Sequence, residues 1–126
     1  MILESALLCL SLNIYYEAGY EPPEAQMAVA LVTLNRAHHK QTKVCDVVFA
    51  KKQFSWTNNI QSLNRPTGEA WLNSLNTAKK ALKTKSSMDF TQGATHFYAE
   101  YIDPPEWTYD MEYVGQYGKH LFFKKY

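Results

Sequence analysis

The sequence predicts an α+β fold that is mainly helical and carries a small β-hairpin. Near the start, apolar residues recur at steps of four, three and four, as on one face of an amphipathic helix: Leu3, Leu7, Leu10 and Ile14. Residues 27–32 are apolar on every side, as in a buried helix, and after Gly93 the residues alternate with the period of a strand. A chain of 126 residues, 46% of them hydrophobic, can bury one core, so we expect residues 1–126 to form a single domain.

Two long helices are expected to form the centre of the fold. The first covers about residues 3–18 and is apolar around much of its circumference. The second begins at Pro22-Pro23 and runs to about Ala37, because proline at the first helical positions followed by Glu24 is typical of a helix start. We expect Asn35-Arg36 at its end to cap or tether the loop that follows.

The middle of the chain predicts a loop, a short apolar element and a third helix. Residues 38–43 form a polar connection, and residues 44–49 a short apolar helix or turn. After a turn at residues 64–68, Thr67 is expected to cap the third helix. Its core stripe is Trp71, Leu75, Ala78 and Leu82. Its lysines lie near its C-terminus, where the helix dipole favours them, and should form a solvated face: Lys79, Lys80, Lys83 and Lys85.

The last third of the chain predicts two paired strands. In the first strand one face carries Thr95, Phe97, Ala99 and Tyr101, and the other carries Ala94, His96, Tyr98 and Glu100. Residues 103–107 contain two prolines and form a turn that cannot continue the strand. Residues 118–123 supply the partner strand.

Composition limits the partners that the chain can have. Thirteen Lys and Arg against twelve Asp and Glu leave a formal charge of +1, which gives no electrostatic reason to expect nucleic acid or a membrane surface. No stretch approaches the length of a transmembrane helix, and residues 6–10 lack the flanking features of a secretory leader. The aromatic content of 14% suits either a sugar-stacking groove or a core. We expect a monomer without a cofactor.

Two cysteines, Cys9 and Cys45, could form one disulfide. Both lie in apolar surroundings, where free buried thiols are equally natural, and we favour free thiols.

Glu17 is the principal candidate for catalysis. It is the next member of the apolar series that ends at Ile14, so a carboxylate stands where a core residue is due. Burial and the negative end of the helix dipole would both raise its pKa, which is how a general acid is made. The alternative is a glutamate that turns to solvent at a helix end.

A second catalytic carboxylate is not evident. Most glycosidases pair the acid with a nucleophile or base. Glu21 and Glu24 are near in sequence, but a proline-containing break and a first helical turn usually hold solvated or dipole-complementing carboxylates. One acid suffices if the sugar's own hydroxyl attacks the anomeric carbon and the same glutamate gives and then takes a proton.

Other chemistries are less well supported. Adjacent His38 and His39 do not share a helix face, so we expect no metal site. Cys45 with His96 could be drawn as nucleophile and base, but its valine neighbours indicate an inert thiol. Residues 53–57 alternate polar and aromatic side chains, and they either contact a sugar or pin a loop to the core.

Four ordered blocks between about residues 5 and 123 carry a resemblance to a known family. The blocks are LSLNIYYEA at 10–18 with parts of 21–36, VCDVV at 44–48 with QFSW at 53–56, GATHFYA at 93–99, and PEW at 105–107 with GKHLF at 118–122. Together they resemble the cell wall hydrolase family that includes the spore-cortex-lytic enzyme SleB.

The resemblance implies a compact lysozyme-like or lytic-transglycosylase-like α+β fold that acts on peptidoglycan glycan strands. It implies that Glu17 is the catalytic acid, and that the bond between N-acetylmuramic acid and N-acetylglucosamine is cleaved by lytic transglycosylation. The blocks expected to line the groove contain the candidate substrate contacts: Gln53, Ser55, Thr95, His96 and Tyr98. The alternatives are a hydrolytic N-acetylmuramidase and a non-catalytic glycan-binding or virion structural module.

The chain departs from the family pattern after the Glu-Ala pair, where Gly19-Tyr20 replaces the usual Arg-Gly. A bare catalytic domain without a leader resembles a phage endolysin. Such a protein is made in the cytoplasm without a signal peptide and reaches the cell wall at lysis.

Overall fold

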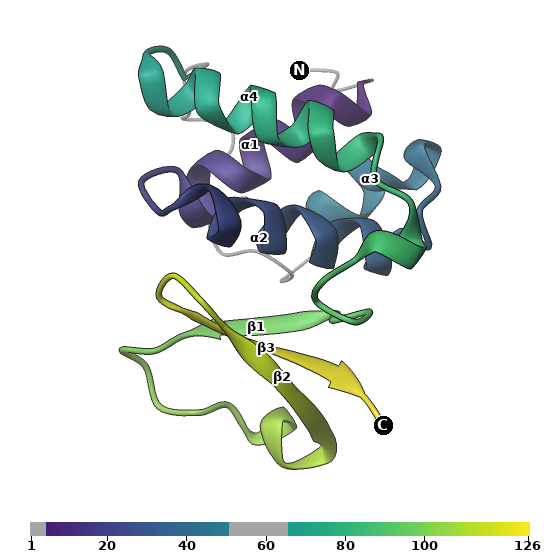
Figure 1. Cartoon of the computed structure of the whole chain (residues 1–126), viewed down its shortest axis with the longest axis vertical. Coiled ribbons are helices and arrows are strands. Elements are labelled where there is room, and N and C mark those ends of the chain that lie inside the picture. Colours follow the sequence, from purple (N-terminus) through teal and green to yellow (C-terminus); the bar gives the residue numbers. More distant parts are fainter. Residues whose placement is uncertain (1–4, 51–65) are drawn as a thin grey trace.

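A computed structural model of the chain describes residues 5–50 and 66–126. Four helices, α1 (Ala6–Ala18), α2 (Pro23–Arg36), α3 (Gln41–Val48) and α4 (Glu69–Leu82), gather in one half. The other half is a sheet of β1 (His96–Ala99), β2 (Met111–Tyr117) and β3 (His120–Lys125) (Figure 1). Short 3₁₀ turns, η2 (Ser86–Met88) and η3 (Glu106–Asp110), lie in the connections. The predicted mainly helical α+β fold is confirmed.

Helix α1 lies at the centre of the helical half and packs against α2, α3 and α4. Ser5 caps it, its Oγ accepting the Leu8 amide at 3.2 Å. Leu10 and Ile14 of the predicted stripe are fully buried. Helix α2 begins at Pro23, with Pro22 as N-cap, and is buried from Ala25 to Leu34 apart from the partly buried Met27. Both predicted helices are confirmed, but the first begins at Ala6 rather than at about residue 3, because Ser5 is extended and caps it. Residues 1–4 lie outside the described residues.

The predicted boundary before α3 was wrong. Residues 41–43 were expected in a polar connection, but they form the first turn of the helix. Their exposed side chains are the solvent face of a helix whose Val44 and Val48 are buried. The turn between α2 and α3 contains His38 and His39, both of which adopt positive φ.

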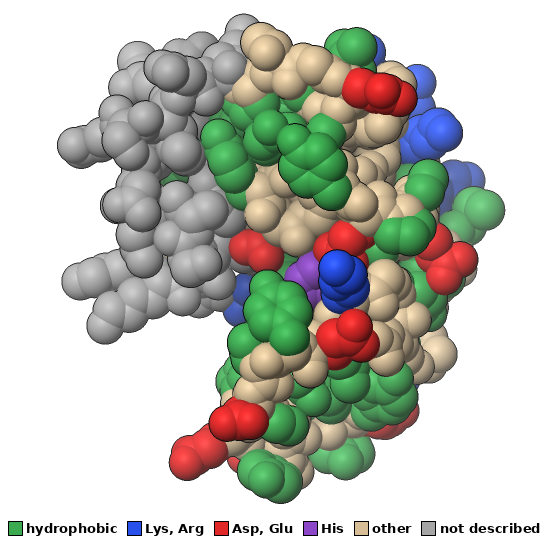
Figure 2. Space-filling view, turned by 90° about the vertical axis from the view of Figure 1, so that its left-hand side faces the viewer, with side chains coloured by type: hydrophobic (Ala, Val, Ile, Leu, Met, Phe, Trp, Pro, Cys, Tyr) green, Lys and Arg blue, Asp and Glu red, His purple; other side chains and the backbone are tan. Residues whose placement is uncertain are grey.

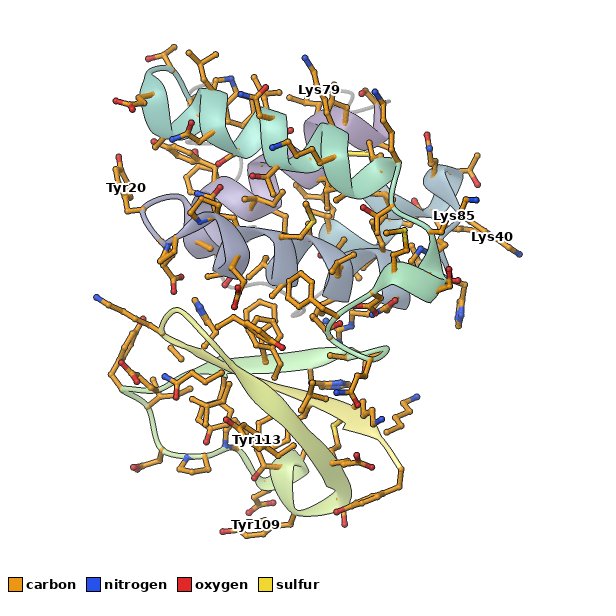
Figure 3. All side chains as sticks on the ribbon, viewed as in Figure 1. Tyr20, Lys40, Lys79, Lys85, Tyr109 and Tyr113 are labelled. Carbon is orange, nitrogen blue, oxygen red and sulfur yellow. A yellow bond between two sulfur atoms is a disulfide. The ribbon has the colours of Figure 1, made fainter. Side chains whose placement is uncertain are left out.

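Helix α4 confirms the predicted third helix with one correction. Its N-cap is Gly68 rather than Thr67, and no side-chain cap bond is formed among the described residues. Trp71 and Ala78 of the predicted stripe are buried, and Leu75 and Leu82 are partly buried. The lysines near its end are exposed as predicted, and Lys79 points away from the helical bundle (Figure 3).

The prediction of free thiols was wrong, because Cys9 and Cys45 form a disulfide. Each cysteine does lie among apolar side chains, but α1 and α3 pack against each other and bring the two Cα atoms to 5.3 Å. That distance is ordinary for a disulfide. The sequence surroundings of each cysteine carry no information on this packing.

The sheet has the strand order β1-β3-β2 and is antiparallel throughout. The predicted pairing of residues 94–101 with 118–123 is confirmed, with Phe97 opposite Phe122. Strand β2 was missed, and the predicted hairpin is part of a three-stranded sheet. A shift in register between Tyr113 and Gly115 interrupts the period of two that would have marked this strand.

Contacts between described residues attach the sheet to the helices, both through an apolar cluster and through two turns. Phe122 and Phe97 pack on the apolar face formed by Ala18, Val29 and Val32. The β2–β3 turn, at Gly118 and Lys119, meets the turn between α1 and α2. Gly118 has a φ of 59°, and a Cβ there would overlap the Glu21 carboxylate and Ala25. The close approach of the two turns therefore requires glycine.

Loss of the disulfide is expected to destabilise the protein by about 4 kcal/mol, because the bond closes a loop with a sequence separation of 36. The Cys9→Ser/Cys45→Ser double variant and the reduced wild type should both show a clearly lower melting temperature in calorimetry. Equal melting temperatures with and without a reductant would contradict the bond.

Candidate active site

Glu17 lies on the last turn of α1, where the helical half meets the sheet. Its side chain is half-buried. Burial raises the pKa of Glu17 to about 7, and the negative charge of Glu21 adds to the rise. A carboxyl group with this pKa can give a proton and take one back near neutral pH.

A cleft of about 420 Å³ adjoins Glu17. Aromatic side chains from α1, β1 and the loop after β1 supply much of its wall: Tyr16, Phe97, Tyr98, Tyr101 and Trp107. Tyr101 is 80% exposed, so the wall is open to a ligand on that side. Aromatic faces of this kind stack on the apolar faces of sugar rings.

Glu21 is tied to the β2–β3 hairpin across the junction. Its Oε2 lies 3.0 Å from Nδ1 of His120, and its Oε1 accepts the Lys119 amide at 2.7 Å. The interpretation of Glu21 as a solvated carboxylate was wrong, since its side chain is only 13% exposed. Glu24 is exposed on the first turn of α2, as expected. Charged and histidine side chains gather at this junction in Figure 2.

His120 is a site residue that the sequence analysis missed. It is buried, lines the cleft beside Glu17, and places its ring 5.1 Å from the ring of Phe97. The only sequence signal was a histidine in an apolar strand segment directly after a glycine turn. Its partner Glu21 is 99 positions away, so the pair could not be predicted from local pattern.

Of the described residues predicted to contact substrate, only one lines the cleft beside Glu17. Tyr98 lines the cleft with Glu17. Thr95 and His96 do not line it; they bond to each other, with Thr95 Oγ1 2.8 Å from Nδ1 of His96. The ring of Trp107 is close to both groups, 5.0 Å from the His96 ring and 6.1 Å from the Tyr98 ring. Gln53 and Ser55 lie outside the described residues.

The protonation of His96 is set by its surroundings. Burial lowers the pKa of His96, and the positive charges of Arg36 and Lys125 lower it further. The imidazole is therefore neutral near pH 7. A neutral ring held by Thr95 can donate or accept a hydrogen bond, as a sugar hydroxyl or acetamido group requires.

Asn35 tethers the loop that follows α2, as predicted, through its contact with His39, and it also holds the segment that leads into β1. Its Nδ2 donates to Asp89 Oδ2 at 2.8 Å and to the Ala94 carbonyl at 2.9 Å, and its Oδ1 lies 2.8 Å from Nε2 of His39. Asp89 also accepts the Thr91 and Gly93 amides. This network sets where β1 begins and so positions Tyr98 in the cleft.

Glu17 is the sole carboxylate among the described residues that line its cleft. Residues 51–65, which are not described, contain no Asp or Glu in their sequence. In the ranges 5–50 and 66–126, no three His, Cys, Asp or Glu side chains are close enough to hold a metal ion. No helix in these ranges is long and apolar enough to cross a bilayer.

A half-buried acid in an aromatic cleft, between a helical body and a small sheet, defines a candidate glycan-cleaving site. A family model described as Cell Wall Hydrolase matches residues 20–123, and the chain belongs to the cell wall hydrolase family. The match begins three positions after Glu17. The family resemblance stated from the sequence is thereby confirmed.

The chain is similar to the spore cortex-lytic enzyme of Oceanobacillus iheyensis, with 29% identity over 114 residues. That alignment covers 88% of this chain and 38% of the relative, so the chain spans well under half of its length.

Two solved structures share the fold. The catalytic domain of the germination-specific lytic transglycosylase SleB from Bacillus anthracis has a TM-score of 0.75 at 24% identity, over 98% of this chain and 97% of that chain. The catalytic domain of the Bacillus cereus SleB protein has the same TM-score and identity, over 98% and 93%. The expected lytic-transglycosylase-like fold is confirmed.

The raised pKa predicts how Glu17→Gln changes stability. The ordinary pKa is 4.5 and the folded-state value is about 7, so the unfolded chain loses this proton first as the pH rises. The free energy of unfolding of the wild type therefore decreases as the pH rises from 4.5 to about 7. Gln cannot ionise, so the variant should match the wild type near pH 4 and be more stable by up to about 3 kcal/mol near pH 8.

Urea unfolding at both pH values measures this difference. Glu24→Gln, which makes the same change at an exposed position outside the cleft, is the matched control. A Glu17→Gln variant that is less stable than the wild type at both pH values would contradict the burial argument.

Proposed function

We propose that this chain cleaves peptidoglycan glycan strands at the β-1,4 bond between N-acetylmuramic acid and N-acetylglucosamine, as a lytic transglycosylase with Glu17 as general acid and base. The observation that carries the proposal is that Glu17 is the only carboxylate lining the aromatic cleft in the described residues, with a pKa of about 7. One carboxyl group with this pKa suits a reaction that needs no second carboxylate.

The reaction uses the single carboxyl group twice. The Glu17 carboxyl protonates the glycosidic oxygen as the bond to the anomeric carbon of N-acetylmuramic acid breaks. The C6 hydroxyl of the same sugar then attacks that carbon, and the Glu17 carboxylate removes its proton. The products are a 1,6-anhydro end and a free hydroxyl on N-acetylglucosamine, and Glu17 is protonated again.

The other site residues bind and orient the strand. Tyr98 and Trp107 supply aromatic faces for sugar rings beside Glu17. The Thr95–His96 pair lies beside Trp107 and outside the cleft lining, and its proposed role is to contact a sugar farther along the strand. Gln53 and Ser55 stay predicted contacts from the sequence. The fixed charge of Glu21 disfavours ionisation of Glu17 before substrate arrives.

The proposed place of action is the cell wall. The disulfide between Cys9 and Cys45 suits an oxidising extracytoplasmic setting. The germination-specific lytic transglycosylase from Bacillus anthracis has the same fold. We propose that residues 1–126 act as one catalytic unit and as a monomer. The endolysin interpretation rests on the sequence argument alone and stays a prediction.

Purified cell walls test the function. Wild-type protein is expected to lower the turbidity of a wall suspension, and mass analysis of the soluble fragments should show 1,6-anhydro ends. Glu17→Gln should lower the rate by at least about a thousandfold, because general acid catalysis is lost while the cleft keeps its shape. Glu24→Gln should retain the wild-type rate.

The products separate the alternatives. Fragments with free reducing ends would contradict transglycosylation and indicate a muramidase with a positioned water. If folded wild-type protein binds the walls but does not lyse them, the proposal of an enzyme is contradicted and a glycan-binding module is indicated.

A further inference from the structure

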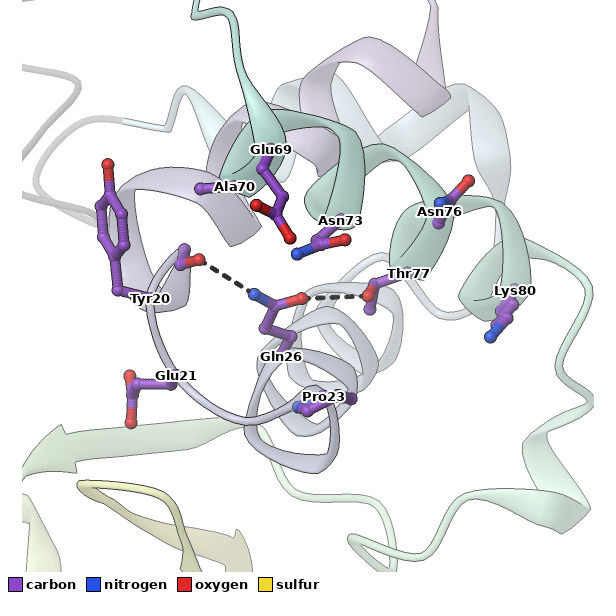
Figure 4. A pocket seen from close by; sticks show the side chains of 11 residues that line it. Tyr20, Glu21, Pro23, Gln26, Glu69, Ala70, Asn73, Asn76, Thr77 and Lys80 are labelled. Atoms are coloured by element: carbon purple, nitrogen blue, oxygen red, sulfur yellow. Dashed lines mark hydrogen bonds between the residues drawn. The ribbon is translucent and has the colours of Figure 1, made fainter.

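A second cleft lies on the other side of the turn between α1 and α2. Its volume is about 460 Å³, and its walls are that turn, the start of α2 and one face of α4 (Figure 4). Glu21 lines this cleft, and its carboxylate also contacts His120, which lines the Glu17 cleft. The two clefts therefore share the turn as a common wall.

The floor of the second cleft is fixed by Gln26. The Gln26 side chain donates to the carbonyls of Ala18 and Gly19 at 3.1 and 3.2 Å, and it accepts from Thr77 Oγ1 at 3.1 Å. Gln26 is 3% exposed. The bonds satisfy carbonyls at the end of α1 and join three helices, so the cleft has a preformed floor.

One wall of the second cleft is a polar face of α4. Its members follow one another at steps of four, three and four: Glu69, Asn73, Asn76 and Lys80. All four are exposed, while the opposite face of α4 is buried. Neither Glu69 nor Lys80 forms an ion pair within the described part of the chain. The wall thus presents an acid, two amides and a base in order.

We propose that this second cleft binds the peptide stem of peptidoglycan, an inference that rests on the proposed function. A stem is a short peptide with backbone amides, free carboxylates and a side-chain amine. The two asparagine side chains can hydrogen-bond to the backbone amides of the stem. Lys80 can pair with a stem carboxylate, and Glu69 can pair with the stem amine. A neutral glycan would leave both charges of the wall unmatched.

The dimensions agree with a stem. Glu69 and Lys80 are eleven positions apart, which is about 16 Å along a helix axis. An extended peptide of four or five residues spans about 13–18 Å. Stems branch from N-acetylmuramic acid, so a stem on a sugar bound beside Glu17 has only to cross the shared turn. Tyr20, which is 87% exposed, lies on that turn and lines the second cleft (Figure 4).

The experiment measures binding of a free stem tetrapeptide, without sugar, to the full chain by calorimetry at low salt. Wild type should bind it. Lys80→Glu should weaken binding at least about fivefold, because the charge that meets the carboxylate is reversed. Lys79→Glu is the matched control: it makes the same change on the neighbouring exposed lysine, which does not line the cleft, and it should bind like wild type.

A second readout uses two substrates, stem-bearing glycan strands and strands from which an amidase has removed the stems. Lys80→Glu should lower the rate on stem-bearing strands and leave the rate on stripped strands unchanged. Equal loss with Lys79→Glu, no binding of the tetrapeptide to wild type, or competition by a stem-free glycan oligomer would overturn the proposal.

The two proposals fail separately. If the wild type binds the tetrapeptide with the Lys80 dependence described but cleaves neither strand, the catalytic function is wrong and the stem site stands. If both strands are cleaved at equal rates and no peptide binds, the stem site is wrong and the catalytic function stands.

Discussion

The contact between the α1–α2 turn and the β2–β3 turn is the interaction on which the site depends. Glu21 joins the two turns through the Lys119 amide and Nδ1 of His120, and Gly118 allows the close approach. Without this contact the sheet would still pack through Phe122, but its position against the end of α1 would not be fixed. Because the cleft beside Glu17 is formed between these halves, the same contact determines its shape.

The same carboxylate also influences the chemistry. A partly buried Glu21 that is held in place keeps its negative charge at a fixed distance from Glu17, and this charge adds to the effect of burial on the pKa of Glu17. Structural attachment and electrostatic tuning thus come from one side chain. The end of α1 is held from the other side by Gln26, whose bonds to Ala18 and Gly19 secure the turn that follows Glu17.

Local pattern was enough to predict most of the helices and the partial burial of Glu17. The position of Glu17 in an apolar stripe predicted a half-buried carboxyl, because helical periodicity depends only on neighbours three and four apart. The disulfide, strand β2 and the Glu21–His120 contact were not predicted. Cys9 and Cys45 meet only through the packing of α1 on α3, and a register shift hides the alternation of β2. Each of these features depends on contacts between distant segments.

The most direct test of the account is the pKa of Glu17, measured by carbon-13 NMR titration of its carboxyl group. The account predicts a value of about 7 in the wild type. It also predicts a lower value in Glu21→Gln, which removes a nearby negative charge and keeps a side chain of the same shape. A wild-type value near the ordinary 4.5 would contradict the account, because Glu17 would then be ionised and unable to act as the acid at neutral pH.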